Sequence, residues 1–248
     1  MLKNYFLVLF VLIFTSSLAG QDMNKYKNIS WRIYHSLNWK DYVDYESEEW
    51  KNIPIEEKNS LFQIPTEELK AISTDELIEV SIDCYFARRI GKFSTIDSYY
   101  EEIYKGFNGF RELTTRKDVS RKMIDYYKGL NLQAVTSSQA GLPMKKQVQI
   151  LEYLIVHPMI LMWLNPEELA QLLSNLKEKY AEKTTMTTFY SEQDMVPNVY
   201  ALARMLEKKD QQTSIRLHNV DKIDIFLGSG IFLSRETREQ ILNICKGL

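Results

Sequence analysis

The chain has 248 residues, of which 45% are hydrophobic, and its 31 basic and 33 acidic side chains give a net charge of -2. A chain of this length and composition can bury a substantial apolar core, so we expect a globular protein. The near-neutral charge, without a basic stripe, argues against a nucleic-acid-binding protein, and we predict no nucleic-acid partner.

Residues 1–19 have the parts of a secretory signal peptide. Lys3 gives a positive start, residues 5–14 are an unbroken apolar run, and small residues precede the expected cut after Ala19. A membrane-spanning helix needs about 20 apolar residues, so we predict that the leader is cleaved rather than kept as an anchor. Gln21 stands where a lipid-attachment signal would place cysteine. We therefore predict an exported protein, periplasmic or secreted, with no lipid anchor and no transmembrane span after cleavage.

Residues 20–63 form a predicted N-terminal arm that is rich in aromatic side chains. Their spacing is close to a helical repeat, and the set comprises Trp31, Tyr34, Trp39, Tyr42, Tyr45 and Trp50. On an exposed face such rings could stack on a sugar or on a partner's apolar surface. Buried rings would instead dock the arm onto the core, which is the commoner position of large aromatic side chains. Trp31, Trp39 and Trp50 are therefore candidate binding residues, with burial as the favoured alternative.

Residues 64–248 show a hydrophobic period near 3.6 and repeated helix-start signals, which predict a helical domain. Ser73 and Glu76 form a capping-box pattern, so we expect a helix from Ser73 to about Arg89. Thr115 and Asp118 repeat the pattern, which predicts a second helix that begins after Thr115.

Asn165 and Pro166 are the clearest helix start, because asparagine caps, proline suits the first turn, and Glu167 and Glu168 favour the positive end of the helix dipole. The expected apolar face comprises Leu169, Leu172, Leu173, Leu176 and Tyr180. Shorter helices are predicted to start near Thr95, Pro143, Ser191 and Ser234, the last ending at Gly247. Residues 223–233 fit neither a helix nor a strand and stay open.

These starts recur at the length scale of paired-helix solenoid repeats, but the pairs share no residue-level similarity. We therefore predict an all-α fold, an irregular antiparallel array of helix-turn-helix pairs, with a solenoid-like α-α superhelix as a more regular alternative. Residues 150–164 are the most apolar stretch after the leader, and His157 and Pro158 interrupt it. We expect a buried helix, turn and helix there rather than a membrane span.

Cys84 and Cys245 are too few for a disulfide scaffold. We expect two buried free thiols, with a single bridge between them as the alternative. His35, His157 and His218 lack the spacing of metal ligands, so we predict no metal and no cofactor.

The sequence contains none of the common nucleophile, phosphate-binding or metalloprotease motifs. Its adjacent acid pairs, Glu48 with Glu49, Glu101 with Glu102 and Glu167 with Glu168, would diverge by about 100° on a helix and rarely share a substrate. A non-enzyme is therefore favoured. The alternative is a hydrolase or lyase that acts on a polysaccharide or peptide through carboxylates brought together only by the fold.

Residues 111–122, RELTTRKDVSRK, surround a predicted helix start with basic side chains. Free backbone amides beside such side chains could bind a phosphate, a carboxylate or an acidic glycan. Arg111, Arg116, Lys117 and Arg121 are therefore candidate binding residues. Interleaved acids favour the alternative of a solvated face with internal salt bridges.

Three segments carry a resemblance: EEWKNIP, FQIPTEELKAISTDELIEV and FNGFRELTTRKDVSRKMIDYY. Together they cover about residues 48–130 and are similar to an uncharacterised family of exported all-helical proteins from Gram-negative anaerobic bacteria. The resemblance implies an exported helical protein and carries no assigned activity. Separately, with no catalytic motif in the chain, we expect a binding or interaction module at the cell envelope, whose partner is an envelope protein or a glycan. A purely structural or assembly role in the envelope is a further alternative.

Overall fold

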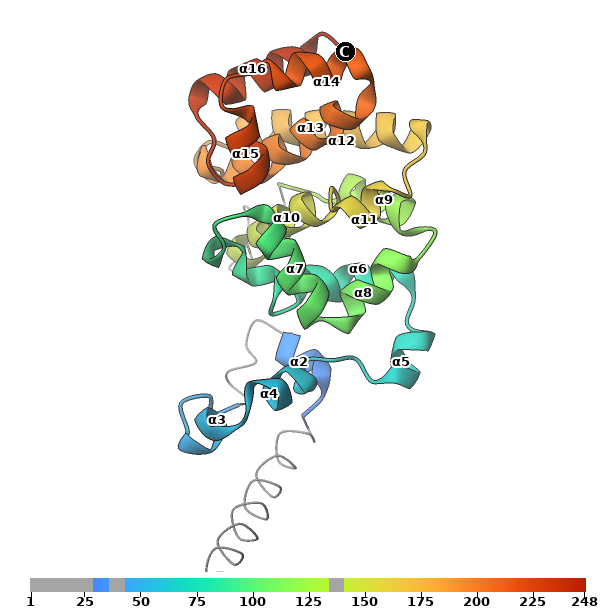
Figure 1. Ribbon diagram of the computed structural model, residues 1–248, viewed down its shortest axis with the longest axis vertical. Coiled ribbons are helices and arrows are strands. Elements are labelled where there is room, and N and C mark those ends of the chain that lie inside the picture. The colour runs from blue at the N-terminus through green and yellow to red at the C-terminus, as the bar shows by residue number, and fades with distance from the viewer. Residues whose placement is uncertain (1–28, 36–42, 134–140) are drawn as a thin grey trace, which may run out of the picture. The chain divides into compact units, whose positions relative to one another are not determined.

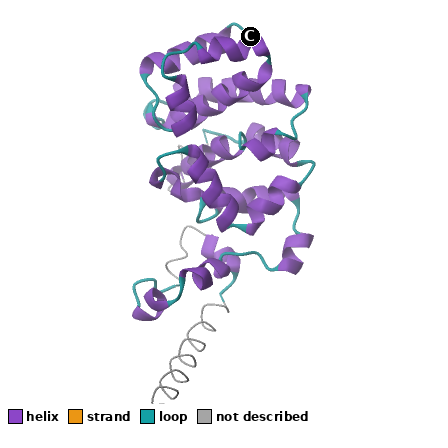
Figure 2. Ribbon diagram, viewed as in Figure 1, coloured by secondary structure: helices purple, strands orange, loops and turns teal. Residues whose placement is uncertain are grey.

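The computed structural model describes residues 29–35, 43–133 and 141–248, and all regular elements in these ranges are helices (Figures 1 and 2). The all-α prediction is therefore confirmed. The chain divides into an N-terminal unit, Met1–Pro65, and a C-terminal unit, Thr66–Leu248. The boundary expected after residue 63 lies beside this division. The predicted leader falls outside the described residues.

Several aromatic rings are buried among the described residues of the N-terminal unit. Its helices are α2 (Trp31–His35), α3 (Glu48–Asn52) and α4 (Ile55–Leu61). Trp31 and Trp50 are only 6% and 8% exposed. The ring of Tyr34 stacks on Trp50, with centroids 6.5 Å apart, and contacts Phe62 at 5.2 Å. Trp31, Tyr34, Trp50 and Phe62 are thus buried, and Tyr34 joins Trp50 to Phe62 within this unit.

The C-terminal unit holds most of the helices. They are α5 (Thr66–Ala71), α6 (Thr74–Asp83), η2 (Ala87–Lys92), α7 (Ile96–Gly106), α8 (Asn108–Thr115), α9 (Val119–Gly129), α10 (Gly141–Leu154), α11 (Pro158–Leu161), α12 (Pro166–Thr184), η4 (Gln193–Met195), α13 (Val196–Lys209), α14 (Gln211–His218), α15 (Ile223–Ser229) and α16 (Arg235–Lys246). Within this unit α13 is central, packed against α10, α12, α14 and α16 (Figure 1).

Several predicted caps are confirmed. Asn165 accepts a hydrogen bond from the Glu168 amide at 2.9 Å while the Glu168 carboxylate accepts one from the Asn165 amide at 3.2 Å, which closes a capping box at the start of α12. Thr95 and Ser234 likewise cap α7 and α16, and Gly247 ends α16. These short-range signals depend only on neighbours in the chain, so the sequence reveals them.

Two predicted helix boundaries are wrong. Ser73 does cap α6, accepting from the Glu76 amide, but α6 ends at Asp83 rather than near Arg89. Cys84 takes an extended backbone conformation there, with φ -64° and ψ 146°. The predicted start near Ser191 is also displaced, since α13 begins at Val196 after the short η4.

The capping box expected at Thr115 and Asp118 does not form. Thr115 is the last residue of α8, and its hydroxyl donates to the Glu112 carbonyl at 2.7 Å. Asp118 is the N-cap of α9, yet its side chain makes no capping bond and instead accepts a hydrogen bond from the Thr74 hydroxyl at 3.0 Å. A tertiary contact with α6 therefore replaces the local one.

The open segment 223–233 begins with a helix. α15 is bounded by Lys222, with φ 57°, and Gly230, with φ 70°. At Gly230 a side chain would be strained by the left-handed backbone, and its Cβ would come within 3.1 Å of Ile96. Sequence periodicity failed here because two left-handed residues confine the helix to fewer than three turns.

The apolar segment 150–164 forms the expected helix, turn and helix. Leu154 ends α10, Pro158 begins α11, and the residues between them are buried. Among the described residues, no helix is long and apolar enough to cross a membrane.

A buried ion pair joins the helices around this segment. Glu152 of α10 and Lys183 of α12 have side chains that are 0% exposed, and the Lys183 ammonium donates to both carboxylate oxygens at 2.6 and 2.8 Å. The Tyr127 hydroxyl of α9 and the Asn198 amide of α13 donate to the same carboxylate at 2.8 and 3.1 Å. Four helices thus meet at one fully buried carboxylate.

Removing one partner of this pair should be far more harmful than removing both. We expect Lys183→Met to lower the free energy of unfolding by about 3–5 kcal/mol, because it leaves the Glu152 charge buried and unpaired. The double variant Lys183→Met with Glu152→Met should recover much of this loss. Urea unfolding followed by circular dichroism at pH 7 measures both values. A single variant no less stable than the double variant would show that the pair is uncoupled.

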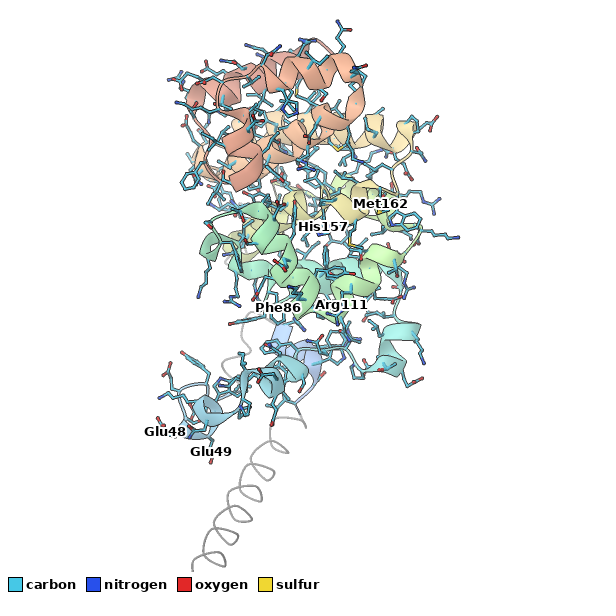
Figure 3. The ribbon with its side chains drawn as sticks, viewed as in Figure 1. Glu48, Glu49, Phe86, Arg111, His157 and Met162 are labelled. Carbon is cyan, nitrogen blue, oxygen red and sulfur yellow. The ribbon has the colours of Figure 1, made fainter. Side chains whose placement is uncertain are left out.

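His157 links α10 to α11 in a crowded position (Figure 3). Its Nδ1 accepts from the Met159 amide at 3.2 Å, and its ring contacts Tyr100 and Phe110 with centroids 4.5 and 5.1 Å apart. Burial, aided by the positive charge of Arg204, lowers the pKa of His157 from 6.5 to about 4. The folded protein therefore keeps this imidazole neutral at mildly acidic pH.

This shift predicts an acid sensitivity. As the pH falls below 6.5, His157 binds a proton in the unfolded chain. In the folded chain it binds that proton only near pH 4, because its pKa is lowered. Stability is therefore lost across this window, by about 2 kcal/mol between pH 7 and pH 5. His157→Asn keeps a helix-capping side chain but does not titrate, so its free energy of unfolding should fall less over the same range. Equal pH dependence of the two proteins in urea titrations would contradict the prediction.

Candidate functional site

The basic residues 111–122 do not converge on a common site. The Arg111 guanidinium donates to the carbonyls of Tyr104 and Lys105 at 3.0 and 2.9 Å, so it caps the end of α7 (Figure 3). Arg116 instead donates to the Glu112 carboxylate at 2.7 Å. Arg116 thus pairs with an interleaved acid, whereas Arg111 bonds to backbone carbonyls.

The start of α9, which follows Arg116 in the chain, does not provide the predicted anion site. Asp118 already places a carboxylate at that helix end, and Lys122 pairs with Asp75 at 2.8 Å. Lys117 and Arg121 are exposed on the surface beside it. The basic cluster predicted from the sequence is thus divided. The Arg111 guanidinium lies at the end of α7, Arg116 follows the end of α8, and Lys117 and Arg121 lie near the start of α9.

The candidate binding tryptophans that the structure describes do not form an exposed stripe. Trp31 and Trp50 lie in the buried aromatic core of the N-terminal unit. Trp39 lies outside the described residues. Stacking on a sugar ring by Trp31 or Trp50 would first require that core to open.

The adjacent acid pairs do not form a shared site. Glu101 pairs with Lys105 on α7, and Glu102 pairs with Arg89 at 2.6 Å. Glu168 closes the cap of α12, and Glu48 pairs with Lys51 at 3.1 Å. In each pair at least one carboxylate is therefore engaged by a nearby cation or a helix cap. No cluster of metal-ligating side chains occurs within the described ranges.

Both cysteines are free and buried, which confirms the favoured expectation. Burial raises the pKa of Cys84 to about 12 and that of Cys245 to about 11. Neither thiol forms the reactive thiolate at neutral pH.

An open groove with a volume of about 660 Å³ lies in the C-terminal unit. Its walls come from the end of α11, the first part of α12, the end of α13 and the last residue of the chain. Five leucines give it an apolar surface, namely Leu161, Leu164, Leu169, Leu173 and Leu248. This volume is in the range of small-ligand and peptide pockets.

The polar edge of the groove is basic. Lys177 projects from α12, and Lys208 and Lys209 end α13. The Lys208 ammonium donates to the carbonyl of the groove residue Leu161 at 3.4 Å, which places it beside the leucines. Among the described residues, no aspartate or glutamate lines the groove. We call this feature the lysine-rimmed groove.

Exposed apolar side chains stand next to the groove. Met162, which follows the groove residue Leu161, is 69% exposed (Figure 3). Trp163 is 37% exposed, and its indole nitrogen donates to the Thr114 carbonyl at 3.0 Å. This bond ties the loop between α11 and α12 to α8. Flexible methionine beside a fixed indole is typical of surfaces that bind proteins.

Sequence reasoning missed this groove, although a signal existed. Leu169 and Leu173 stand four residues apart, as do Leu172 and Leu176. Leu169 and Leu173 line the groove, where Leu169 is half-buried and Leu173 is 6% exposed, whereas Leu172 and Leu176 are both 0% exposed. The apolar face of α12 is therefore wide enough to supply both the core and the groove.

The lysine-rimmed groove thus offers an apolar floor and a cationic edge, which suits a ligand with both apolar and anionic groups. No known protein family, curated protein or solved structure matches this sequence. The chemistry of the groove is therefore deduced from its own residues.

The buried thiols give a simple test of the fold around the site. In the native protein at pH 8, Cys84 and Cys245 should react with Ellman's reagent at least about 100-fold more slowly than a free thiol, since little thiolate forms and access is blocked. Unfolding in urea should release both. Rapid reaction of either thiol in the native protein would contradict the buried placement.

Proposed function

We propose that the protein is a non-enzymatic binding module that acts at the cell envelope, with the lysine-rimmed groove as its binding site. The observation that carries this proposal is the groove itself, an open apolar surface edged by three lysines and, in the described structure, lined by no aspartate or glutamate. An apolar floor holds a ligand by burial, and the lysines select ligands with negative charge.

The leader and the family resemblance support export. On this proposal the chain is cleaved after Ala19 and works in the periplasm or outside the cell, without a lipid anchor. It belongs with the exported helical proteins that residues 48–130 resemble. The partner is a component of the envelope.

The groove does not favour the hydrolase or lyase alternative. Carboxylate-dependent enzymes of this kind place a pair of carboxylates around the substrate, one on each side of the bond that is cleaved. Here the lining side chains are leucines, lysines and small polar groups. The fully buried Glu152 is held by Lys183 within the core and does not line the groove.

The dye 1-anilinonaphthalene-8-sulfonate tests the proposed site, because it joins an apolar ring system to a sulfonate. We expect fluorescence titration to show binding that weakens as salt rises. Ala170→Glu, at an exposed position that lines the groove, should weaken binding at least tenfold by adding bulk and negative charge. Lys208→Glu should weaken it about fivefold.

Two matched variants serve as controls. Ala181→Glu makes the same change at an exposed position of α12 away from the groove, and Lys128→Glu reverses an exposed lysine on α9. Both should bind the dye within twofold of the original protein. Circular dichroism should confirm that all variants are folded. Dye binding that is absent, or equal in Ala170→Glu and Ala181→Glu, would refute the groove as the binding site.

A further inference from the structure

The shape of the lysine-rimmed groove indicates an elongated ligand. Leu169, Leu173 and Lys177 recur every four residues and so lie along one face of α12. From Pro166 to Lys177 this lining face covers about 16 Å at the rise of an α-helix. A face of that length matches about three turns of a docked helix, rather than a single head group.

The charges of the groove come from two helices. Lys177 lies on α12, whereas Lys208 and Lys209 lie at the end of α13. Lys209 has a weak acidic neighbour, Asp210, at 3.9 Å. Two of these lysines also suit the negative end of the α13 dipole, but Lys177 stands within α12 and has no such role. Stabilisation of helix ends therefore explains Lys208 and Lys209 but not Lys177.

We propose that the lysine-rimmed groove docks an acidic amphipathic helix of a partner protein. Apolar side chains of that helix lie on Leu169 and Leu173, and its aspartates or glutamates face the lysines. This is the helix-in-groove mode of recognition, in which anchors recur every three or four residues. The inference rests on the proposed function and names the partner class of the same site.

A protein partner fits the groove better than a bilayer surface. The leucines form a hollow, and a flat membrane surface would meet the lysines while leaving that floor uncovered. Met162 and Trp163, which lie between the groove residues Leu161 and Leu164 in the chain, are also exposed. A helix that projects side chains can fill the hollow.

Selection from a random peptide library displayed on phage tests this inference, with the purified protein as the target. We expect the enriched peptides to combine apolar residues at intervals of three or four with several aspartates or glutamates. A synthetic copy, labelled with fluorescein, would then be titrated by anisotropy. Its affinity should fall at least tenfold with Ala170→Glu and with Lys208→Glu plus Lys209→Glu, and stay within twofold with Ala181→Glu.

A charge swap makes the test directional. The same peptide with its acids replaced by lysines should bind the original protein poorly and regain affinity for the Lys208→Glu plus Lys209→Glu variant. Such recovery would not arise from general damage to the fold. Circular dichroism of each variant completes the comparison.

The remaining outcomes overturn the inference and leave the proposed function distinguishable from it. Basic or neutral selected peptides, no selected peptides, or peptides unaffected by Ala170→Glu would refute an acidic helix. If the dye still binds the groove in that case, only the inference fails. Groove-dependent binding of phosphatidylglycerol vesicles without peptide binding would replace the protein partner by a membrane. Groove-dependent self-association in light scattering would replace it by a second copy.

Discussion

Among the described residues of the C-terminal unit, the fully buried pair Glu152–Lys183 is the interaction on which the helix packing most depends. A carboxylate moved from water into a protein interior is costly unless it is paired and hydrogen-bonded, and Glu152 meets both conditions through Lys183, Tyr127 and Asn198. The pair stabilises the folded state only when α9, α10, α12 and α13 are all in place. Any slip of one helix along another would leave a buried charge unsatisfied. The network therefore selects one packing of helices whose apolar surfaces alone would tolerate several.

This constraint also positions the candidate site. α12 carries Lys183 and the buried Leu172 and Leu176 toward the core, while Leu169 and Leu173 line the groove. Since Lys183 fixes the rotation of α12 about its axis, it also fixes the direction in which the groove leucines point. The opposite wall, at the end of α13, belongs to the helix that supplies Asn198. Both walls are thus held by the same network, which favours a groove that is already formed in the unbound protein.

The sequence predicted what local chemistry decides. The caps at Asn165, Thr95 and Ser234 and the helix-turn-helix at residues 150–164 follow from neighbours in the chain, and the structure has them. Asp118 is a residue for which reasoning from chain neighbours failed. Its carboxylate could have capped a helix locally, but the Thr74 hydroxyl of a distant helix holds it instead. Helix existence was therefore easier to predict than helix boundaries, because boundaries depend on which distant partner competes for a side chain.

The leucine pattern of α12 did not by itself reveal the groove, for a related reason. A pair of leucines on a helix predicts burial, but it does not reveal whether a neighbouring helix covers both. Leu173 is buried and Leu169 only half-buried, and α13 ends at Lys209 beside the groove that both leucines line. The cationic edge likewise joins Lys177 to Lys208, which only the packing of α12 against α13 brings to one groove. The candidate site is thus a consequence of where one helix stops beside another, a property of the assembled unit rather than of either segment.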